Sequence, residues 1–432
     1  MVAPAYSEDT YVDHDLSTNL DSTFAFEGPE KLLEVWFWPA PEAIPEGISK
    51  EGLRAIPLEK WKAILDLVNC KILSMKSSPA VDAYLLLESS LFVFPHKMIL
   101  KTCGTTTTLA CIDEIFHTAR TFLESQITSQ SAYKVFYSRR SFMFPDRQVH
   151  VHTDWKHEVQ LLNQHFACGK LYVVGDFTSD DHWYLYLGGR GSTKQARGHG
   201  HDQTFEILMT RLDPAKTQQF VTARKPGDVS ATADAEEDLD LGHELGYLTM
   251  ALLALDSVFL PDSAGLADMD SHAIPSPQLS DSMELSDDET PSRKASGIKF
   301  IHDAFLFHTL WGYYYTLHIT PEAGWSYASF ETNYPFTLCK QVDIVNVLKK
   351  VLAIFRPGKF SMTLFSDQLC TCNGRPNHPF AKLASCEKTL RKLGYAKQEK
   401  AVYDLKGEYD LLYFKLRKTG LASTNTKQVV WY

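Results

Sequence analysis

The chain has 432 residues, of which 44% are hydrophobic and 22% are charged, and its formal net charge at pH 7 is −10. This composition is typical of a globular protein with enough apolar material for one large core or two smaller ones. The acidic balance argues against sequence-independent binding to nucleic acid, because such binding requires Lys and Arg side chains against the phosphates.

Targeting, membrane and metal signals are weak. Residues 1–23 are polar and acidic, without the basic and apolar regions of a signal peptide, and we expect a disordered leader there. No apolar run is long enough to cross a bilayer. The eight cysteines are spread along the chain, and pairs such as Cys370 and Cys372 lack the paired spacing of a zinc site. These features predict a reduced, cytoplasmic protein with no membrane partner and no metal.

Strands and helices are predicted to follow one another from Phe24 onward. Residues 32–38 predict a strand that is apolar on both faces, and Pro57 suits the first turn of a helix. Further helices are predicted after Gly104, over 154–166 and near 341–355, and further strands at 83–87, 91–94, 98–102, 133–139, 170–175, 182–187, 204–212, 311–320, 325–332, 359–366 and 408–416. Short gaps between strands indicate an α+β fold with mainly antiparallel sheets covered by helices.

Two segments differ in composition from the rest. Residues 223–241 contain an acidic run, and residues 261–297 are rich in Ser, Asp and Pro with almost no aromatic side chains. Such segments cannot bury enough apolar area to offset the entropy of ordering. We therefore predict a disordered insertion at 261–297.

The segment 84–110 places polar residues between apolar strands. Glu88, Ser89 and Ser90 are predicted to form a turn there. On residue types alone an ordinary hairpin turn is the better interpretation, because serine is common in turns. Cys103 alone would likewise fit an inert buried thiol, and His318 would fit a hydrogen-bonded core residue. Composition alone would favour a noncatalytic α+β interaction protein.

Seven motifs, taken together, change this interpretation. In chain order they are FEGPEKLLEVWF (26–37), LLESSLFV (86–93), LKTCGTT (100–106), YSRRSFMFP (137–145), DQTFEILM (202–209), LHITPE (317–322) and YASFETN (327–333). Several motifs in one order are far more specific than one short match. On these motifs, the chain resembles the eukaryotic-type, fungal-like S-adenosylmethionine decarboxylase proenzyme family across residues 24–420, apart from the insertions.

The resemblance implies both a fold and a reaction. The fold is an α+β, four-layer α/β/β/α sandwich: two antiparallel sheets packed face to face, with helices on the outer faces, in one domain over 24–432. In the reaction, the Ser89 hydroxyl attacks the Glu88 carbonyl, and self-cleavage yields a β chain, 1–88, and an α chain, 89–432. The new pyruvoyl group, made from Ser89, forms a Schiff base with S-adenosylmethionine and accepts electrons as carbon dioxide leaves. The product donates aminopropyl groups to spermidine and spermine synthesis, and the enzyme is expected to be a homodimer of αβ units.

Catalytic roles follow from the same resemblance. Cys103 stands where the family places the acid that reprotonates the product, and a thiol suits this role because its pKa lies near the working range. His318 stands where the family places the base for β-elimination during processing. Glu27 and Glu30 match acidic residues linked to activity. Each of these carboxylates, taken alone, also fits a solvated loop.

Substrate contacts are implied as well. Phe26 and Phe307 occupy the positions of two rings that sandwich the adenine, and stacked rings also favour a nearby cation. Glu322 matches the carboxylate that binds the ribose hydroxyls. Glu88, the residue before the cut, is a further substrate-binding candidate.

A second, acidic site is expected. Glu34 lies inside an apolar strand, where a carboxylate is costly unless paired. By resemblance it belongs to a buried cluster that binds putrescine as an activator in some members, because a dication offsets buried like charges. Leu32 stands where plant members carry Arg, which favours the diamine-responsive form. The putrescine-site candidates are Glu34, Phe136, Asp202, Thr204, Glu206 and Glu331.

One family motif is missing. Members carry a Pro-Cys-Gly-Tyr-Ser stretch shortly before HITPE, and its serine assists processing. Between Phe307 and His318 the chain is about nine residues shorter and has no equivalent serine. Three interpretations stay open: a diverged decarboxylase that processes slowly, a gene model that lost the segment, and an impaired paralogue acting as a regulatory partner. Retention of Glu88, Ser89 and Cys103 favours the decarboxylase.

Overall fold

A computed structural model gives the fold of most of the chain. The predicted leader, 1–23, and the predicted insertion, 261–297, lie outside the described residues. These are 30–86, 89–124, 126–142, 144–179, 182–192, 202–217, 221–223, 299–301, 304–308, 313–320, 326–336, 342–367, 378–405 and 408–420. Among them no helix is long and apolar enough to cross a membrane.

The first large sheet has eight strands, and every neighbouring pair is antiparallel. Their order is β2-β3-β4-β5-β1-β6-β8-β7. The strands are β1 (Lys31–Trp36), β2 (Ile72–Ser77), β3 (Asp82–Leu86), β4 (Ser89–Val93), β5 (Lys97–Thr102), β6 (Lys134–Arg140), β7 (Lys170–Val174) and β8 (Trp183–Gly188). β1 lies between β5 and β6 and is covered by helices on one face and by the second sheet on the other, which explains why apolar residues occur on both faces.

The second large sheet has seven strands in the order β12-β13-β14-β9-β15-β17-β16, again antiparallel. A separate short pair is formed by β10 and β11. The strands are β9 (Gln203–Thr210), β10 (Val221–Ala223), β11 (Lys299–Ile301), β12 (Ala304–His308), β13 (Tyr314–Thr320), β14 (Tyr327–Thr332), β15 (Lys359–Asp367), β16 (Tyr395–Leu405) and β17 (Tyr409–Lys418).

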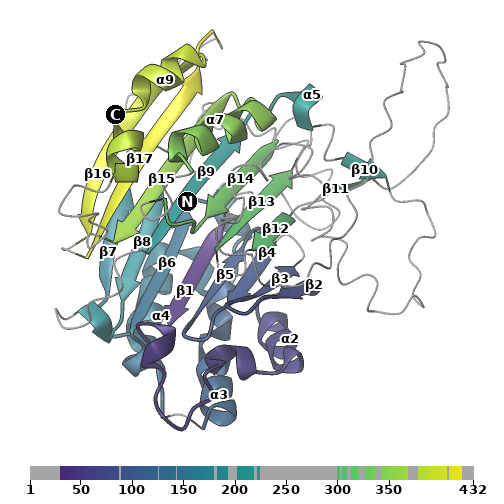
Figure 1. Cartoon of the computed structure of the whole chain (residues 1–432), viewed down its shortest axis with the longest axis vertical. Helices are drawn as coiled ribbons and strands as arrows, with labels where there is room; N and C mark the ends of the chain where they lie inside the picture. Colours follow the sequence, from purple (N-terminus) through teal and green to yellow (C-terminus); the bar gives the residue numbers. More distant parts are fainter. Residues whose placement is uncertain are drawn as a thin grey trace, which may run out of the picture.

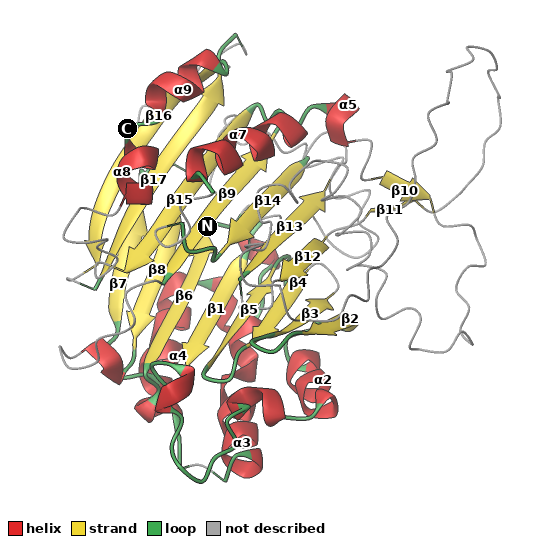
Figure 2. Ribbon diagram, viewed as in Figure 1, coloured by secondary structure: helices red, strands yellow, loops and turns green. Residues whose placement is uncertain are grey.

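Helices cover the outer faces of both large sheets (Figures 1 and 2). α2, α3 and α4 lie on the first sheet and α7, α8 and α9 on the second. The helices are α2 (Leu58–Asp66), α3 (Ile112–Phe122), α4 (Trp155–His165), α5 (Pro214–Thr217), α7 (Ile344–Phe355), α8 (His378–Ala384) and α9 (Glu387–Lys392). The expected four-layer sandwich is confirmed.

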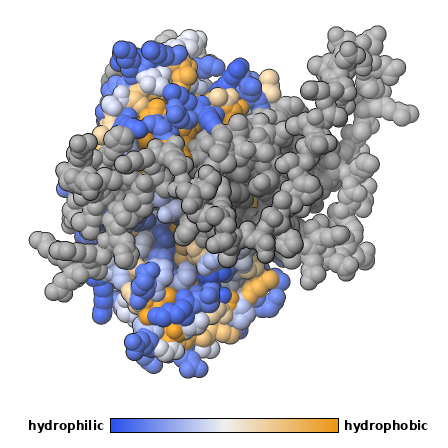
Figure 3. Space-filling model, in the orientation of Figure 1, coloured by the Kyte–Doolittle hydropathy of each residue, from blue (hydrophilic) through white to orange (hydrophobic). Residues whose placement is uncertain are grey.

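Each layer boundary is an apolar core that follows from side-chain alternation. Leu33 and Val35 of β1 point outward and pack in one cluster with Trp61 of α2. Trp36 points inward and packs with Leu208 of the second sheet. The described outer surface at both ends of the molecule is mixed, with hydrophilic and scattered hydrophobic residues (Figure 3). Burial on both faces of the sheets is therefore the main stabilising term.

Three sequence-based predictions differ from the structure. Ser89 and Ser90 are not in a turn: they begin β4, and Ser89 pairs with Leu86. The helix after Gly104 begins later, as a 3-10 turn at Thr108 that continues into α3. The sequence patterns also missed β2, β10, β11, β12, β16, α5, α8 and α9. β16 was missed because most of its residues are polar and exposed or half-buried, as expected for an edge strand.

Candidate functional site between the two sheets

The candidate cleavage residue, Ser89, is fully buried at the first position of β4. Its Oγ accepts a long hydrogen bond of 3.7 Å from the Cys70 thiol, on the helix-covered side of the sheet. Ser90 points the other way, toward the second sheet, by alternation. Glu88 lies outside the described residues. The β3–β4 register leaves two residues, 87 and 88, to connect Leu86 with Ser89.

The candidate proton donor, Cys103, follows β5 directly and is partly exposed. Its backbone carbonyl accepts a hydrogen bond of 2.6 Å from the Thr106 hydroxyl. The next residue, Gly104, has φ of +61°, in the left-handed region that glycine adopts without strain. The thiol therefore sits on a tight turn at the end of a buried strand.

His318 lies in β13 and is buried. Its Nδ1 is 3.3 Å from Oε1 of Glu30, and the same oxygen accepts a 2.5 Å hydrogen bond from the Ser329 hydroxyl. Burial lowers the pKa of His318 below its usual value although Glu30 opposes the effect, so the imidazole is neutral at pH 7. The carboxylate favours the tautomer with its proton on Nδ1. Nε2, which has no hydrogen-bond partner among the described residues, can then accept a proton.

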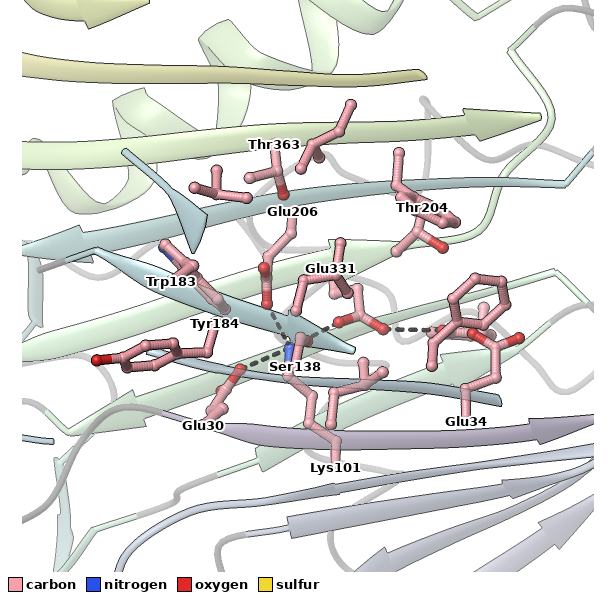
Figure 4. A pocket seen from close by; sticks show the side chains of 17 residues that line it. Glu30, Glu34, Lys101, Ser138, Trp183, Tyr184, Thr204, Glu206, Glu331 and Thr363 are labelled. Carbon is pink, nitrogen blue, oxygen red and sulfur yellow. Dashed lines mark hydrogen bonds and ion pairs between the residues drawn. The ribbon is translucent and has the colours of Figure 1, made fainter. Parts of the chain in front are cut away.

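A buried lysine ties the two sheets together beside His318. Lys101 of β5 places its Nζ 2.6 Å from Glu30, 2.7 Å from Glu331 and 3.0 Å from Glu206 (Figure 4). Glu206 and Glu331 stand directly opposite each other on β9 and β14. Like charges in that position repel, so the shared ammonium is what permits the arrangement.

A second lysine, Lys97, pairs with the carboxylates at the other end of the cluster. Its Nζ is 2.8 Å from Glu34 and 3.7 Å from Asp202, and it lies 4.1 Å above the centre of the Trp36 ring. Glu34 also accepts a 2.7 Å hydrogen bond from the Trp36 indole. The Tyr409 hydroxyl donates to Asp202 at 2.9 Å. The buried carboxylate of Glu34 is therefore paired, as its position requires.

Between these groups lies a cavity of about 100 Å³. Its polar wall contains Glu206, Glu331 and Thr204, and Phe136 contributes to its apolar wall. Figure 4 shows Glu206, Glu331 and Thr204 of the second sheet together with Lys101 and Glu34 of the first. Five of the six putrescine-site candidates line the cavity, and Asp202 joins through Lys97 and does not line it.

Both lysines were missed by the sequence analysis. Lys97 and Lys101 lie four residues apart on one face of β5, which is buried along its whole length. A lysine inside such a strand must be paired, because a lone buried ammonium is strongly disfavoured. That pattern, read beside the expected carboxylates, could have predicted the ion pairs.

The charges are only partly balanced. Burial raises the pKa of Glu206 to about 7, and Lys101 offsets only part of this. Burial also raises the pKa of Glu30, but the effect of Lys101 and His318 is larger, so the net pKa of Glu30 is lowered. Lys101 therefore compensates the burial of Glu30 fully and that of Glu206 only in part.

Several predicted site residues are not placed. Phe26, Glu27 and Glu322 lie outside the described residues, as does Glu88. Phe307 lies in β12, with its backbone opposite Tyr315. Among the described residues, no group of three His, Cys, Asp or Glu side chains could hold a metal ion.

The raised pKa of Glu206 predicts a pH-dependent stability. Its folded-state pKa near 7 exceeds the unfolded value of 4.5, so the folded state binds the extra proton and loses stability as pH rises between these values. We expect Glu206→Gln to be the more stable protein at pH 8, by up to about 3 kcal/mol. In urea unfolding, the free energies of unfolding of the two proteins should become equal near pH 4.5. Ser138→Ala, in the same cavity, should differ from wild type equally at every pH. If the free energies of unfolding of wild type and Glu206→Gln instead change with pH in parallel, Lys101 keeps Glu206 ionised.

Comparison with known proteins identifies the family of this chain. The model of the adenosylmethionine decarboxylase family matches residues 23–417. The S-adenosylmethionine decarboxylase proenzyme of Saccharomyces cerevisiae is 41% identical over 428 residues, 94% of this chain and 96% of that protein. The proenzyme of Onchocerca volvulus is 33% identical over 363 residues, 84% of this chain and 81% of that protein. A solved Trypanosoma brucei AdoMetDC-delta26 monomer gives a TM-score of 0.42 at 18% identity, covering 76% of this chain and 98% of that one. The chain belongs to the adenosylmethionine decarboxylase family, which is a family of enzymes.

Proposed function

We propose that this chain is a proenzyme that cuts itself between Glu88 and Ser89 and then decarboxylates S-adenosylmethionine. The observation that carries the proposal is the match to decarboxylase proenzymes over nearly the whole chain, with Ser89 at the start of a buried strand. The pyruvoyl group made from Ser89 would supply an electron sink for loss of the substrate carboxylate. No metal is needed for this chemistry.

Self-cleavage requires a nucleophile and a base. The Ser89 hydroxyl forms a bond to the Glu88 carbonyl carbon and breaks the peptide C–N bond, which leaves an ester and a free amine. A base then removes the Cα proton of Ser89, and the Cβ–O bond breaks to release the Glu88 carboxylate. Water finally replaces the nitrogen, which leaves as ammonia. The contact of Ser89 with the Cys70 thiol, at 3.7 Å, is weak enough to be exchanged for this attack.

His318 is the proposed base. It is buried and neutral, its Nε2 has no partner among the described residues, and Glu30 orients the ring through Nδ1. Lys101 joins Glu30 to Glu206 and Glu331, so a change of charge in the cavity acts on His318 through one intervening carboxylate. This continuous network supports a coupling between the acidic cavity and processing.

The remaining roles are proposals from family membership. Cys103 would deliver the proton to the Cα of the decarboxylated product, since it is partly exposed on a turn. Phe26 and Phe307 would stack on the adenine, and Glu322 would bind the ribose hydroxyls. Glu27 and the new carboxylate of Glu88 would complete the substrate contacts.

We further infer a homodimer in the cytoplasm. β7 and β16 are the edge strands at the same end of the two sheets, and Leu171 and Val402 on them are 51% and 55% exposed. Open strand edges with exposed apolar side chains suit pairing with a second copy. Sedimentation of the purified chain measures this, and a monomer at micromolar concentration would contradict it.

Intact-mass measurement of the purified chain tests the proposed function. We expect two polypeptides, 1–88 and 89–432, the second lighter than a serine-started chain by one ammonia. Ser89→Ala should stay uncut, because the nucleophile is removed. Wild type should also release carbon dioxide from labelled S-adenosylmethionine. A wild-type chain that stays uncut would refute self-processing and would direct attention to the shortened segment between Phe307 and His318, or to a regulatory role.

The cavity is also proposed to bind putrescine as an activator. Among the described residues two ammonium groups face five carboxylates, so the cluster keeps a surplus of negative charge. The carboxylates are Glu30, Glu34, Asp202, Glu206 and Glu331. A flexible dication with an apolar centre fits acidic groups at the ends of a cavity with apolar walls.

Thermal melting with and without putrescine tests this site. At saturating diamine we expect the Tm of wild type to rise by about 3 °C, because a ligand at a hundred times its Kd adds about 2.7 kcal/mol and a chain of this length unfolds with an entropy of about 0.9 kcal/mol per kelvin. Glu206→Gln should lose most of this shift, since one carboxylate is neutralised. Sodium chloride at equal ionic strength is the control for screening. An equal shift in both proteins would exclude the cavity as the binding site.

A further inference from the structure

A second buried polar cluster lies on the opposite face of the first sheet, under α4. Both oxygens of Glu158 are used: the Arg139 Nε donates to one at 2.6 Å, and the Tyr137 hydroxyl donates to the other at 2.7 Å. His152 places its Nδ1 2.6 Å from Glu158. Tyr137 and Arg139 alternate along β6 with residues that face the cavity, so this cluster lies across the sheet from it. None of the roles proposed above uses it.

Lys31 extends this cluster toward Cys103. Its side chain is fully buried, and its Nζ donates a 2.7 Å hydrogen bond to the carbonyl of Gly104. On the sheet it stands between Arg139 of β6 and Thr102 of β5. A buried ammonium is strongly disfavoured without hydrogen bonds, so this bond holds the Gly104 peptide firmly in place.

The carbonyl that Lys31 holds belongs to the residue that follows Cys103. Gln148 donates to the same carbonyl of Gly104 at 3.4 Å, and the Thr106 hydroxyl donates to the carbonyl of Cys103 at 2.6 Å. Two successive carbonyls are thus fixed by side chains, in a turn where Gly104 already has a left-handed conformation. The backbone on the C-terminal side of the thiol has little freedom left.

The far end of the turn is fixed by the same cluster. The backbone N–H of Leu109 donates to Nε2 of His152 at 3.4 Å. The hydroxyls of Thr102 and Thr108 are 2.6 Å apart and close the base of the loop. The turn that carries Cys103 is therefore held at both ends by groups on the helix-covered side of the sheet.

We propose that Lys31, together with Gln148, is a positioning residue that sets the direction of the Cys103 thiol from behind the sheet. Lys31 does not line the cavity, and it acts on the turn through the Gly104 carbonyl. The geometric part of the proposal stands on these contacts alone. Its consequence for catalysis, correct delivery of a proton by Cys103, rests on the proposed function.

Site-resolved alkylation of the purified chain with iodoacetamide tests the geometric part. Cys168 is exposed and serves as the reference, and peptide mass spectrometry gives the rate at each thiol. In Lys31→Met the Gly104 carbonyl loses its ammonium, so the ratio of the Cys103 rate to the Cys168 rate should change by more than about threefold. Lys31→Arg can still donate to the carbonyl and should restore part of the wild-type ratio.

Two further variants separate positioning from general stability. Lys134→Met removes a partly buried lysine of β6 that contacts Tyr409 and Glu408, and it should leave the ratio unchanged. Gln148→Leu keeps Lys31 and should shift the ratio in the same direction by a smaller amount. If Lys31→Met does not fold, Gln148→Leu still tests whether these side chains position the thiol. A lower Tm for Lys31→Met with an unchanged ratio, or an unchanged ratio in folded Gln148→Leu, would overturn the proposal.

Turnover separates this inference from the proposed function. If the chain processes itself, Lys31→Met should form the pyruvoyl end but lose kcat by about tenfold to a hundredfold with little change in KM, because a misplaced donor affects the chemical step. A wild-type kcat in Lys31→Met would overturn the catalytic consequence. The alkylation ratio is measurable on an uncut chain as well, so a failure of processing leaves the geometric test intact.

Discussion

The site depends on one interaction, the ammonium of Lys101 shared by Glu30, Glu206 and Glu331. The lysine belongs to the first sheet, whereas Glu206 and Glu331 belong to the second. Much of the remaining contact between the sheets is made by apolar side chains, which carry no direction. Buried charges require defined partners and so fix the register of one sheet on the other at this point, although ion pairs of this kind add little net stability.

The first two described residues of the N-terminal strand region connect both faces of the first sheet. Glu30 reaches Lys101, Ser329 and the vicinity of His318 on the inner face, and Lys31 reaches the Gly104 carbonyl on the outer face. Neighbouring residues of a strand point to opposite faces, so one short segment contacts both the surroundings of His318 and the turn that carries Cys103. A displacement of this segment would therefore disturb both, which gives a physical reason for its two buried charges.

The cavity and the thiol turn illustrate two uses of buried polar groups. In the cavity, burial raises the pKa of Glu206 to about 7, and the neighbouring carboxylates Glu331 and Glu30 act in the same direction. Behind the sheet, the hydrogen bonds of Glu158 and Lys31 are directed at fixed neighbours and hold the backbone. The first arrangement can respond to a ligand, and the second can only hold a shape.

The sequence by itself determined an α+β fold with mainly antiparallel sheets covered by helices, because alternating apolar residues specify which face of each strand is buried. The four-layer arrangement came from the resemblance of its motifs to a known family. The sequence also determined the candidate chemistry, since the motifs around Ser89, Cys103 and His318 stand in a specific order. Only the tertiary structure decided that Lys97 and Lys101 neutralise the acidic cluster and that Lys31 holds Gly104. It also decided that Ser89 begins a strand instead of a turn, and that the polar edge strand β16 exists. The reason is that a charge pair or an edge pairing joins residues far apart in the chain, and local periodicity carries no information about the partner.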